Sequence, residues 1–166
     1  LSFLGGECFG SAAVGVRLWL IHVLSALCTG ILLRPKRTLS RDAAPAKAQT
    51  VSFAAAFTAA VQSGFSSFLS VSGFVLLFSV LLQPIKAAFG STPLLGMFEL
   101  FSGAAALDGS HRAFIYAAAL SAWGGLSVHA QSAAFFSAAG LSGKWYFRGK
   151  LLQSAISAAI AAALTF

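Results

Sequence analysis

Glu99 and Asp108 are the only acids in the apolar stretch from Thr92 to Gly140. An ionised carboxylate is costly in hydrocarbon, so Glu99 must meet water, a cation or a hydrogen-bond donor, or be protonated. One interpretation is that Glu99 contacts a substrate or a coupling proton. The alternative is that its carboxyl pairs with a backbone amide or a nearby base and fixes the turn around it.

A second polar group follows the glycine doublet Gly124-Gly125. Ser127 and Gln131 are four residues apart and therefore share one helix face. If the doublet exposes the N-terminus of a half-helix, its free amides and positive dipole end favour an anion. These four residues then form a carboxylate-binding shelf. The alternative is a glycine kink whose polar groups hydrogen-bond to neighbouring helices.

The histidines are dispersed, and no HExxH motif or Cys/His pairing occurs, so no metal site is expected. His22 lies deep in the first apolar segment, where a helix–helix hydrogen bond or a proton-handling role explains it. His129 lies roughly opposite Ser127 on its helix, so we assign it to packing or gating. The sequence has no GxSxG motif and no paired catalytic constellation, so we expect no enzyme and no cofactor.

The elements that position these residues are predicted to be membrane helices. The chain has 166 residues, of which 58% are hydrophobic and only 9% charged, whereas soluble domains carry about a quarter charged residues. Five of its eleven Lys and Arg fall between Arg34 and Lys47, and three between Lys144 and Lys150. Basic clusters that flank apolar spans are typical of cytoplasmic loops, so the partner is a lipid bilayer and not a nucleic acid.

The chain is predicted to divide near residue 49. Residues 1–49 comprise a transmembrane helix over 11–33, long enough for a hydrocarbon core of about 30 Å, and a basic cytoplasmic loop. Residues 1–10 are interpreted as a loop or the tail of an earlier element. Because the chain starts at Leu1 and enters apolar sequence almost at once, we expect a fragment whose N-terminal half is missing.

Residues 50–166 are predicted to form a gate-like helical transport domain. Its first part is a short interfacial helix over 50–62, a bend at Gly64, and a span over 65–83 that Pro84 and Lys86 close. The rest comprises a re-entrant hairpin (93–108), a helix broken at the glycine doublet (111–139) and a terminal helix (143–166). The predicted fold class is an all-α polytopic membrane protein with a re-entrant hairpin and a Gly-broken transmembrane helix.

Two motifs carry a resemblance to a known family. Residues 94–103, LLGMFELFSG, resemble the "GLFE-x-x-x-G" hairpin of the YlbJ-like sporulation integral membrane proteins. Residues 122–131, AWGGLSVHAQ, resemble the "F-GG-LSVH-Q" stretch of the same family. Weaker matches at 20–25 and 72–79 follow in the family's order. The chain resembles roughly the C-terminal half of these proteins, which belong to the nucleoside-recognition "gate" group.

The resemblance implies a function. Family members resemble carriers that move dipicolinic acid into the forespore, so we expect a bacterial inner-membrane protein, in the forespore outer membrane, that binds a small carboxylated anion. A nucleoside-type transporter and a non-transporting scaffold or partner subunit remain alternatives. The positions that match the family motifs are Gly96, Glu99, Gly103, Gly124, Gly125, Ser127, His129 and Gln131.

Overall fold

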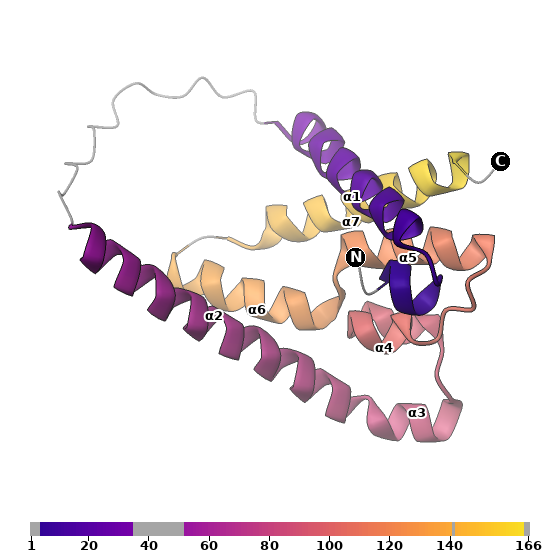
Figure 1. Cartoon of the computed structure of the whole chain (residues 1–166), viewed down its shortest axis with the longest axis horizontal. Coiled ribbons are helices and arrows are strands. Elements are labelled where there is room, and N and C mark those ends of the chain that lie inside the picture. Colours follow the sequence, from indigo (N-terminus) through magenta and orange to yellow (C-terminus); the bar gives the residue numbers. More distant parts are fainter. Residues whose placement is uncertain (1–3, 35–51, 141, 165–166) are drawn as a thin grey trace.

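The structure is a computed structural model that describes residues 4–34, 52–140 and 142–164. Every regular element within these residues is a helix, so the predicted all-α class is confirmed for them (Figure 1). Three helical stretches are long and apolar enough to cross a membrane, at Ala12–Leu32, Phe53–Phe89 and His111–Ser137. By length and composition, the chain is therefore built as membrane-spanning proteins are.

Helices α1 (Ala12–Leu32) and α7 (Lys144–Ala163) pack against each other. Leu33, just after α1, lies beside Gly149 near the start of α7. At the other end, Val14 of α1 and Leu164 line one cavity. The two helices are therefore antiparallel, and the beginning of the basic loop lies at the same end of the molecule as the basic start of α7.

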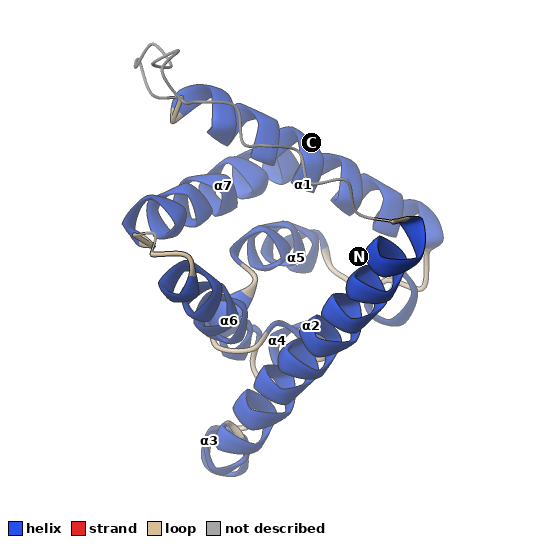
Figure 2. Ribbon diagram, turned by 90° about the vertical axis from the view of Figure 1, so that its left-hand side faces the viewer, coloured by secondary structure: helices blue, strands red, loops and turns tan. Residues whose placement is uncertain are grey.

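Helix α5 (His111–Trp123) lies in the middle of the molecule, with α1 and α7 on one side and the short α4 (Leu100–Ala104) on another (Figure 2). Two serines of α7 join it to α5. The Ser154 hydroxyl donates to the carbonyl of Ala119 at 2.9 Å, and the Ser157 hydroxyl donates to that of Ala118 at 2.8 Å. Small side chains let the two backbones approach closely enough for these hydrogen bonds.

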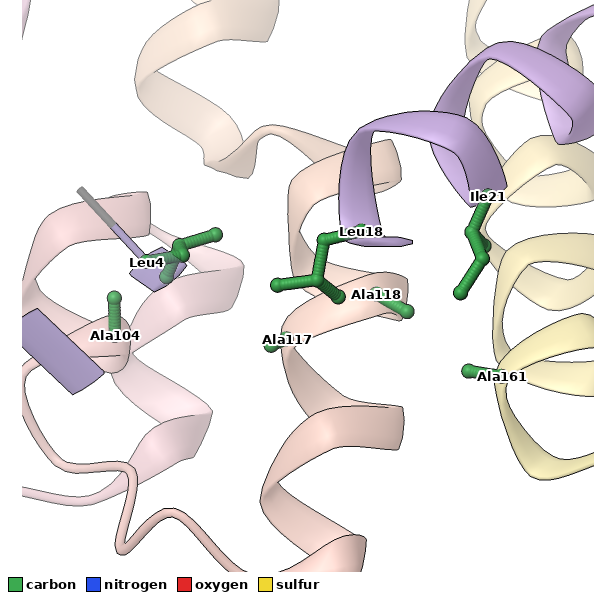
Figure 3. Packing of buried hydrophobic residues seen from close by; sticks show 7 residues of the cluster. All are labelled: Leu4, Leu18, Ile21, Ala104, Ala117, Ala118 and Ala161. Atoms are coloured by element: carbon green, nitrogen blue, oxygen red, sulfur yellow. The ribbon is translucent and has the colours of Figure 1, made fainter. Parts of the chain in front are cut away.

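The hydrophobic core lies where these helices meet (Figure 3). Leu18 and Ile21 of α1 pack over alanines of α5 and α7, and Leu18 is fully buried. Leu4 belongs to a single helical turn, Leu4–Cys8, which precedes α1 and is labelled η1. Residues 4–8 are therefore a helical turn and not a loop, and the buried Leu4 anchors this turn in the core. Residues 1–3 lie outside the described part of the chain. The clustered alanines are Ala104, Ala117, Ala118 and Ala161.

Helix α2 (Phe53–Leu81) is one continuous helix of 29 residues. The predicted separate interfacial helix over 50–62 and the bend at Gly64 are wrong. One glycine costs a helix only about 1 kcal/mol, and the apolar helix formers on both sides continue the hydrogen-bond ladder through it. The hydroxyl of Ser52 caps the first turn by accepting the Ala55 N–H at 3.3 Å. Residues 50 and 51 lie outside the described part of the chain.

Pro84 does not end this helical stretch as predicted. Helix α3 (Gln83–Phe89) follows at once, and Leu82 between them has helical dihedrals, with φ −82° and ψ −11°. Pro84 sits in the first turn of α3, where a missing N–H costs nothing. The helical stretch that could span a membrane therefore runs to Phe89, six residues beyond the predicted end of the span at 83.

Helix α2 leaves nearly its whole surface uncovered. It has no buried residue, and only 6% of its most apolar window is buried inside the molecule. It packs on α6 (Gly125–Ala138) and otherwise runs along one side of the structure (Figure 1). A continuous exposed apolar surface of this kind is typical of contact with lipid or with another protein. Its exposed aromatic side chains are Phe53, Phe57, Phe65 and Phe68.

The segment predicted as a hairpin over 93–108 contains two short helices. A 3₁₀ helix, Pro93–Met97 (η2), packs against α4. Gly96 and Gly103 meet back to back, because a Cβ built on Gly103 would lie 2.3 Å from the Cα of Gly96. Only glycine at both positions permits this approach, and it places the intervening Phe98 and Glu99 at the turn between the two helices.

Candidate functional site

Glu99 caps the first turn of α4. Its side chain is 1% exposed. Oε1 accepts the N–H of Phe101 at 2.8 Å, and Oε2 accepts the N–H of Ser102 at 2.7 Å. The hydroxyl of Ser102 in turn accepts a hydrogen bond from Lys86 Nζ at 2.9 Å. The carboxyl group is thus held by backbone amides. This geometry agrees with the second interpretation from the sequence, in which the Glu99 carboxyl fixes the turn around it.

The chain leaves the helical conformation between α5 and α6. Helix α5 ends at Trp123, and Gly124 and Gly125 have φ of +86° and +81°, in the left-handed region that favours glycine. The N–H of Ser127 donates to the carbonyl of Phe98 at 2.9 Å. The indole Nε1 of Trp123 donates to the carbonyl of Met97 at 3.0 Å. The carbonyls of the η2–α4 turn therefore hold this junction.

This arrangement changes the predicted carboxylate-binding shelf. The shelf required the amides at the start of α6 to be free, but the amide of Ser127 is bonded to Phe98. A Cβ on Gly125 would lie 3.0 Å from the same Phe98 oxygen, so the backbone of the turn fills the space in front of the doublet. The expectation of an open amide shelf at Ser127 is wrong, because protein carbonyl groups satisfy the helix end first.

The other predicted site residues fall into separate places. Gly103 supports the turn through its contact with Gly96, and it therefore belongs with Glu99. Gln131 lies one turn beyond Ser127 on α6, is 7% exposed, and its amide nitrogen has no partner among the described residues. His22 lies on α1 beside α7, where its carbonyl accepts the side-chain amide of Gln153 at 3.5 Å. His22 therefore does not contact the turn that contains Glu99 and Gly103.

His129 lies in a box of aromatic rings. Its ring centroid is 4.2 Å from that of Trp123, 4.6 Å from Phe147 and 5.5 Å from Tyr146. The side chain is 4% exposed, and neither ring nitrogen has a hydrogen-bond partner among the described residues. A buried polar group left in this state costs about 1–3 kcal/mol, so it calls for an explanation.

A cavity of about 280 Å³ adjoins this imidazole. It lies between α6 and the first turn of α7. The terminal helix is predicted over 143–166, close to α7, but the sequence does not predict that its first turn contacts His129 through Tyr146 and Phe147. The described residues that line the cavity are His129, Ala133, Phe136, Gly143, Lys144, Tyr146 and Phe147.

The surroundings of this cavity are positively charged. Lys144 lines it, and Lys150 lies close enough for its charge to act on both His22 and His129. Burial lowers the pKa of Lys150, whose ammonium donates to Gln153 Oε1 at 3.3 Å. The sequence contains no Asp or Glu after Asp108. Helices α5 to α7 therefore contain basic side chains but no carboxylate that could pair with them. This charge balance favours an anionic ligand.

Within the described residues, no group of three His, Cys, Asp or Glu side chains is placed to hold a metal ion. Cys8 and Cys28 are free thiols. Over residues 4–34, 52–140 and 142–164, the regular elements are all helices, three helical stretches have membrane-spanning length, and a small aromatic cavity lies beside His129. Comparisons with protein-family models, curated proteins and solved structures found no match. The resemblance to YlbJ-like proteins therefore stays a prediction from the two motifs.

Proposed function

We propose that the chain is part of a bacterial inner-membrane transport protein for a small carboxylated solute. The resemblance makes dipicolinic acid, moved across the forespore outer membrane, the solute to test first. The observation that carries the proposal is the buried, unpartnered imidazole of His129 beside a cavity. The motif match at 122–131 contains this residue.

The chemistry of the cavity fits this class of solute. An imidazole offers a ring N–H donor and, when neutral, a nitrogen acceptor, and both are unused within the described residues. A bound solute that hydrogen-bonds to His129 removes the desolvation cost of that ring. Lys144 in the lining supplies positive charge for a carboxylate, while the walls of Phe136 and Phe147 suit an apolar body.

The two backbone breaks, at the η2–α4 turn and at the glycine doublet, support a transport role. The turn at Phe98 meets the start of α6 through the hydrogen bond from Ser127. Two interrupted helices that face each other are the arrangement found around solute sites of secondary transporters. Under this proposal the η2–α4 segment is the re-entrant hairpin and Gly124 interrupts a transmembrane helix.

The test is solute entry into liposomes that contain the full chain and trapped terbium, whose luminescence rises when dipicolinate chelates it. The wild type is expected to admit dipicolinate. His129→Phe keeps an aromatic ring but removes both nitrogens, and it is expected to lower the initial rate about tenfold, the effect of one lost hydrogen bond to a charged group. Arg112→Phe is the control, because this exposed residue lies outside the cavity lining and at the other end of α5 from Trp123, which contacts the His129 ring.

Two outcomes contradict the proposal. The first is neither entry nor binding of dipicolinate with a wild-type chain that circular dichroism shows to be helical. The second is equal entry with wild type and His129→Phe. A rate that falls equally in Arg112→Phe removes the assignment of the effect to this cavity.

A non-transporting scaffold is the second candidate function. It is favoured by the full use of the Glu99 carboxylate as a helix cap and of the Ser127 amide as a donor to Phe98. On that view the breaks serve packing alone. Gly124→Ala then alters assembly or folding, and dipicolinate entry, where the protein still inserts, is the same as in wild type.

A further inference from the structure

A larger cavity, of about 770 Å³, lies at the opposite end of α5 from the His129 cavity. It opens where the start of α1, the turn before α5 and the end of α7 come together. Its apolar wall includes an edge-to-face aromatic pair, Phe9 and Phe114, with ring centroids 6.2 Å apart. The described residues that line it are Phe9, Val14, Arg17, Gly109, Ser110, His111, Phe114 and Leu164.

The charged groups of this cavity are basic. Arg17 enters it from α1 and His111 from α5, and its described lining contains no carboxylate. Asp108 stands nearby in the sequence, but it is not in the lining, and its Oδ1 accepts the N–H of Ser110 at 3.1 Å. The Arg17 guanidinium and the His111 imidazole can both donate hydrogen bonds to one anionic group, such as a phosphate. The apolar wall around them suits an apolar chain attached to that group.

The position of the cavity points to lipid as the source of that anion. Arg17 is the sixth residue of the candidate span Ala12–Leu32, and His111 is the first residue of the candidate span His111–Ser137. At 1.5 Å of rise per residue, Arg17 lies about 8 Å along its helix from the first residue. Both basic groups are therefore at the level where phospholipid headgroups meet the acyl chains.

We propose that this cavity binds the phosphate of an anionic phospholipid. The Arg17 guanidinium forms the bidentate contact with the phosphate, and His111 donates a second hydrogen bond. The upper acyl chains lie along Val14, Phe114 and Leu164. This site does not depend on the proposed transport function, because it shares no residue with the His129 cavity.

The test is lipid retention by the full purified chain in detergent, measured by native mass spectrometry. Phosphatidylglycerol and phosphatidylcholine with identical acyl chains are supplied in equal amounts. The wild type is expected to retain phosphatidylglycerol preferentially. Arg17→Gln is expected to lower that preference about fivefold, the effect of one arginine at an anionic lipid surface. Arg112→Gln, an exposed neighbour of His111 outside the lining, is expected to keep it.

Three results overturn the proposal. An unchanged lipid preference in Arg17→Gln removes the site. An equal fall in the preference for phosphatidylglycerol in Arg112→Gln means that the lipid responds to the total positive charge at this end of the molecule and not to the cavity. Displacement of phosphatidylglycerol by millimolar glycerol phosphate means that the site takes a soluble phosphate instead of a lipid. Arg17→Lys, which keeps the charge but loses the planar fork, distinguishes the bidentate contact by an intermediate preference.

Discussion

A buried acid in an apolar stretch can be explained at the residue level by helix capping. Glu99 places both carboxylate oxygens on amides of the next turn, at 2.8 Å and 2.7 Å. Both oxygens of the buried side chain therefore have hydrogen-bond donors, which removes the cost of burying them unpaired. Among the described residues, His129 is the side chain with two unpartnered buried atoms, while His22 and Gln131 have one each and the acid has none. Chemistry with a solute is therefore expected at the imidazole.

Glu99→Ala is expected to lower the free energy of unfolding by about 2–3 kcal/mol, because it leaves two amides without their charged acceptor. Chemical unfolding in detergent micelles, followed by tryptophan fluorescence, measures the change. Ser52→Ala is the matched control, since Ser52 caps α2 at an exposed position with a single hydrogen bond of 3.3 Å. That change is expected to cost about 1 kcal/mol or less. Equal losses of unfolding free energy in the two variants would show that a buried helix cap at Glu99 stabilises the fold no more than an exposed one.

Lys150 gives the unfolding free energy a dependence on pH. Burial holds the pKa of this ammonium below 10.5 in the folded chain. Between the folded and the unfolded pKa, the unfolded state binds more protons, so stability rises with pH across that interval. From about pH 7 to about pH 10, the wild type is therefore expected to gain more stability than Lys150→Met. Lys144→Met, an exposed lysine of the same helix, is the control.

The measurement is the denaturant midpoint in micelles at several pH values. The direction of the Lys150 shift places the gain in stability at pH values below the ordinary lysine pKa of 10.5. If wild type and Lys150→Met change in parallel, the ammonium is not desolvated in the folded state. A Lys144→Met curve that follows Lys150→Met would likewise contradict the assignment.

At the scale of elements, the contact between η2 and α4 depends on two glycines. The Cβ of Gly103→Ala would lie 2.3 Å from the Cα of Gly96 and 2.7 Å from the carbonyl oxygen of Pro93. Both neighbours are backbone atoms, so the two short helices must separate. We expect a loss of about 2–4 kcal/mol in unfolding free energy, in the range of overpacked cores.

Gly73→Ala is the control for this prediction. Gly73 lies in the middle of α2, and a Cβ there meets nothing within 4 Å. Alanine favours a helix over glycine by about 1 kcal/mol, so this variant is expected to be neutral or slightly more stable. Thermal unfolding followed by circular dichroism compares the two. A Gly103→Ala protein as stable as wild type would mean that η2 and α4 are not in contact.

Much of the helical pattern follows from the sequence, because apolar runs of span length leave few alternatives. The continuity of α2 through Gly64 does not, since the cost of one glycine is smaller than the gain from the many helix formers around it. The cap at Glu99 could be anticipated only as one of two alternatives. The aromatic contacts around His129 join α5, α6 and α7 through Trp123, His129 and Phe147. A contact between three helices cannot be predicted from the local sequence pattern of any one of them.

At the scale of the whole molecule, the charge distribution and the fold support one orientation. Arg34 follows α1 at the end where Leu33 meets Gly149 of α7, so the described start of the first basic cluster lies beside the second. Asp108 and His111 lie beyond the other end of these helices, near the cavity lined by Arg17. Positive residues favour the cytoplasmic face. We therefore expect residue 108 on the opposite face from residue 142.

Single cysteines test this orientation in a chain that carries Cys8→Ser and Cys28→Ser. Asp108→Cys and Ser142→Cys both replace exposed side chains outside the helices. In sealed vesicles of one orientation, a membrane-impermeant maleimide is expected to label only one of them, and in inverted vesicles only the other, because hydrocarbon separates the two faces. Detergent should make both reactive, which controls for buried thiols. Labelling of both from one face would mean that α5 and α6 together do not cross the bilayer, and the proposed interrupted transmembrane helix would then be lost.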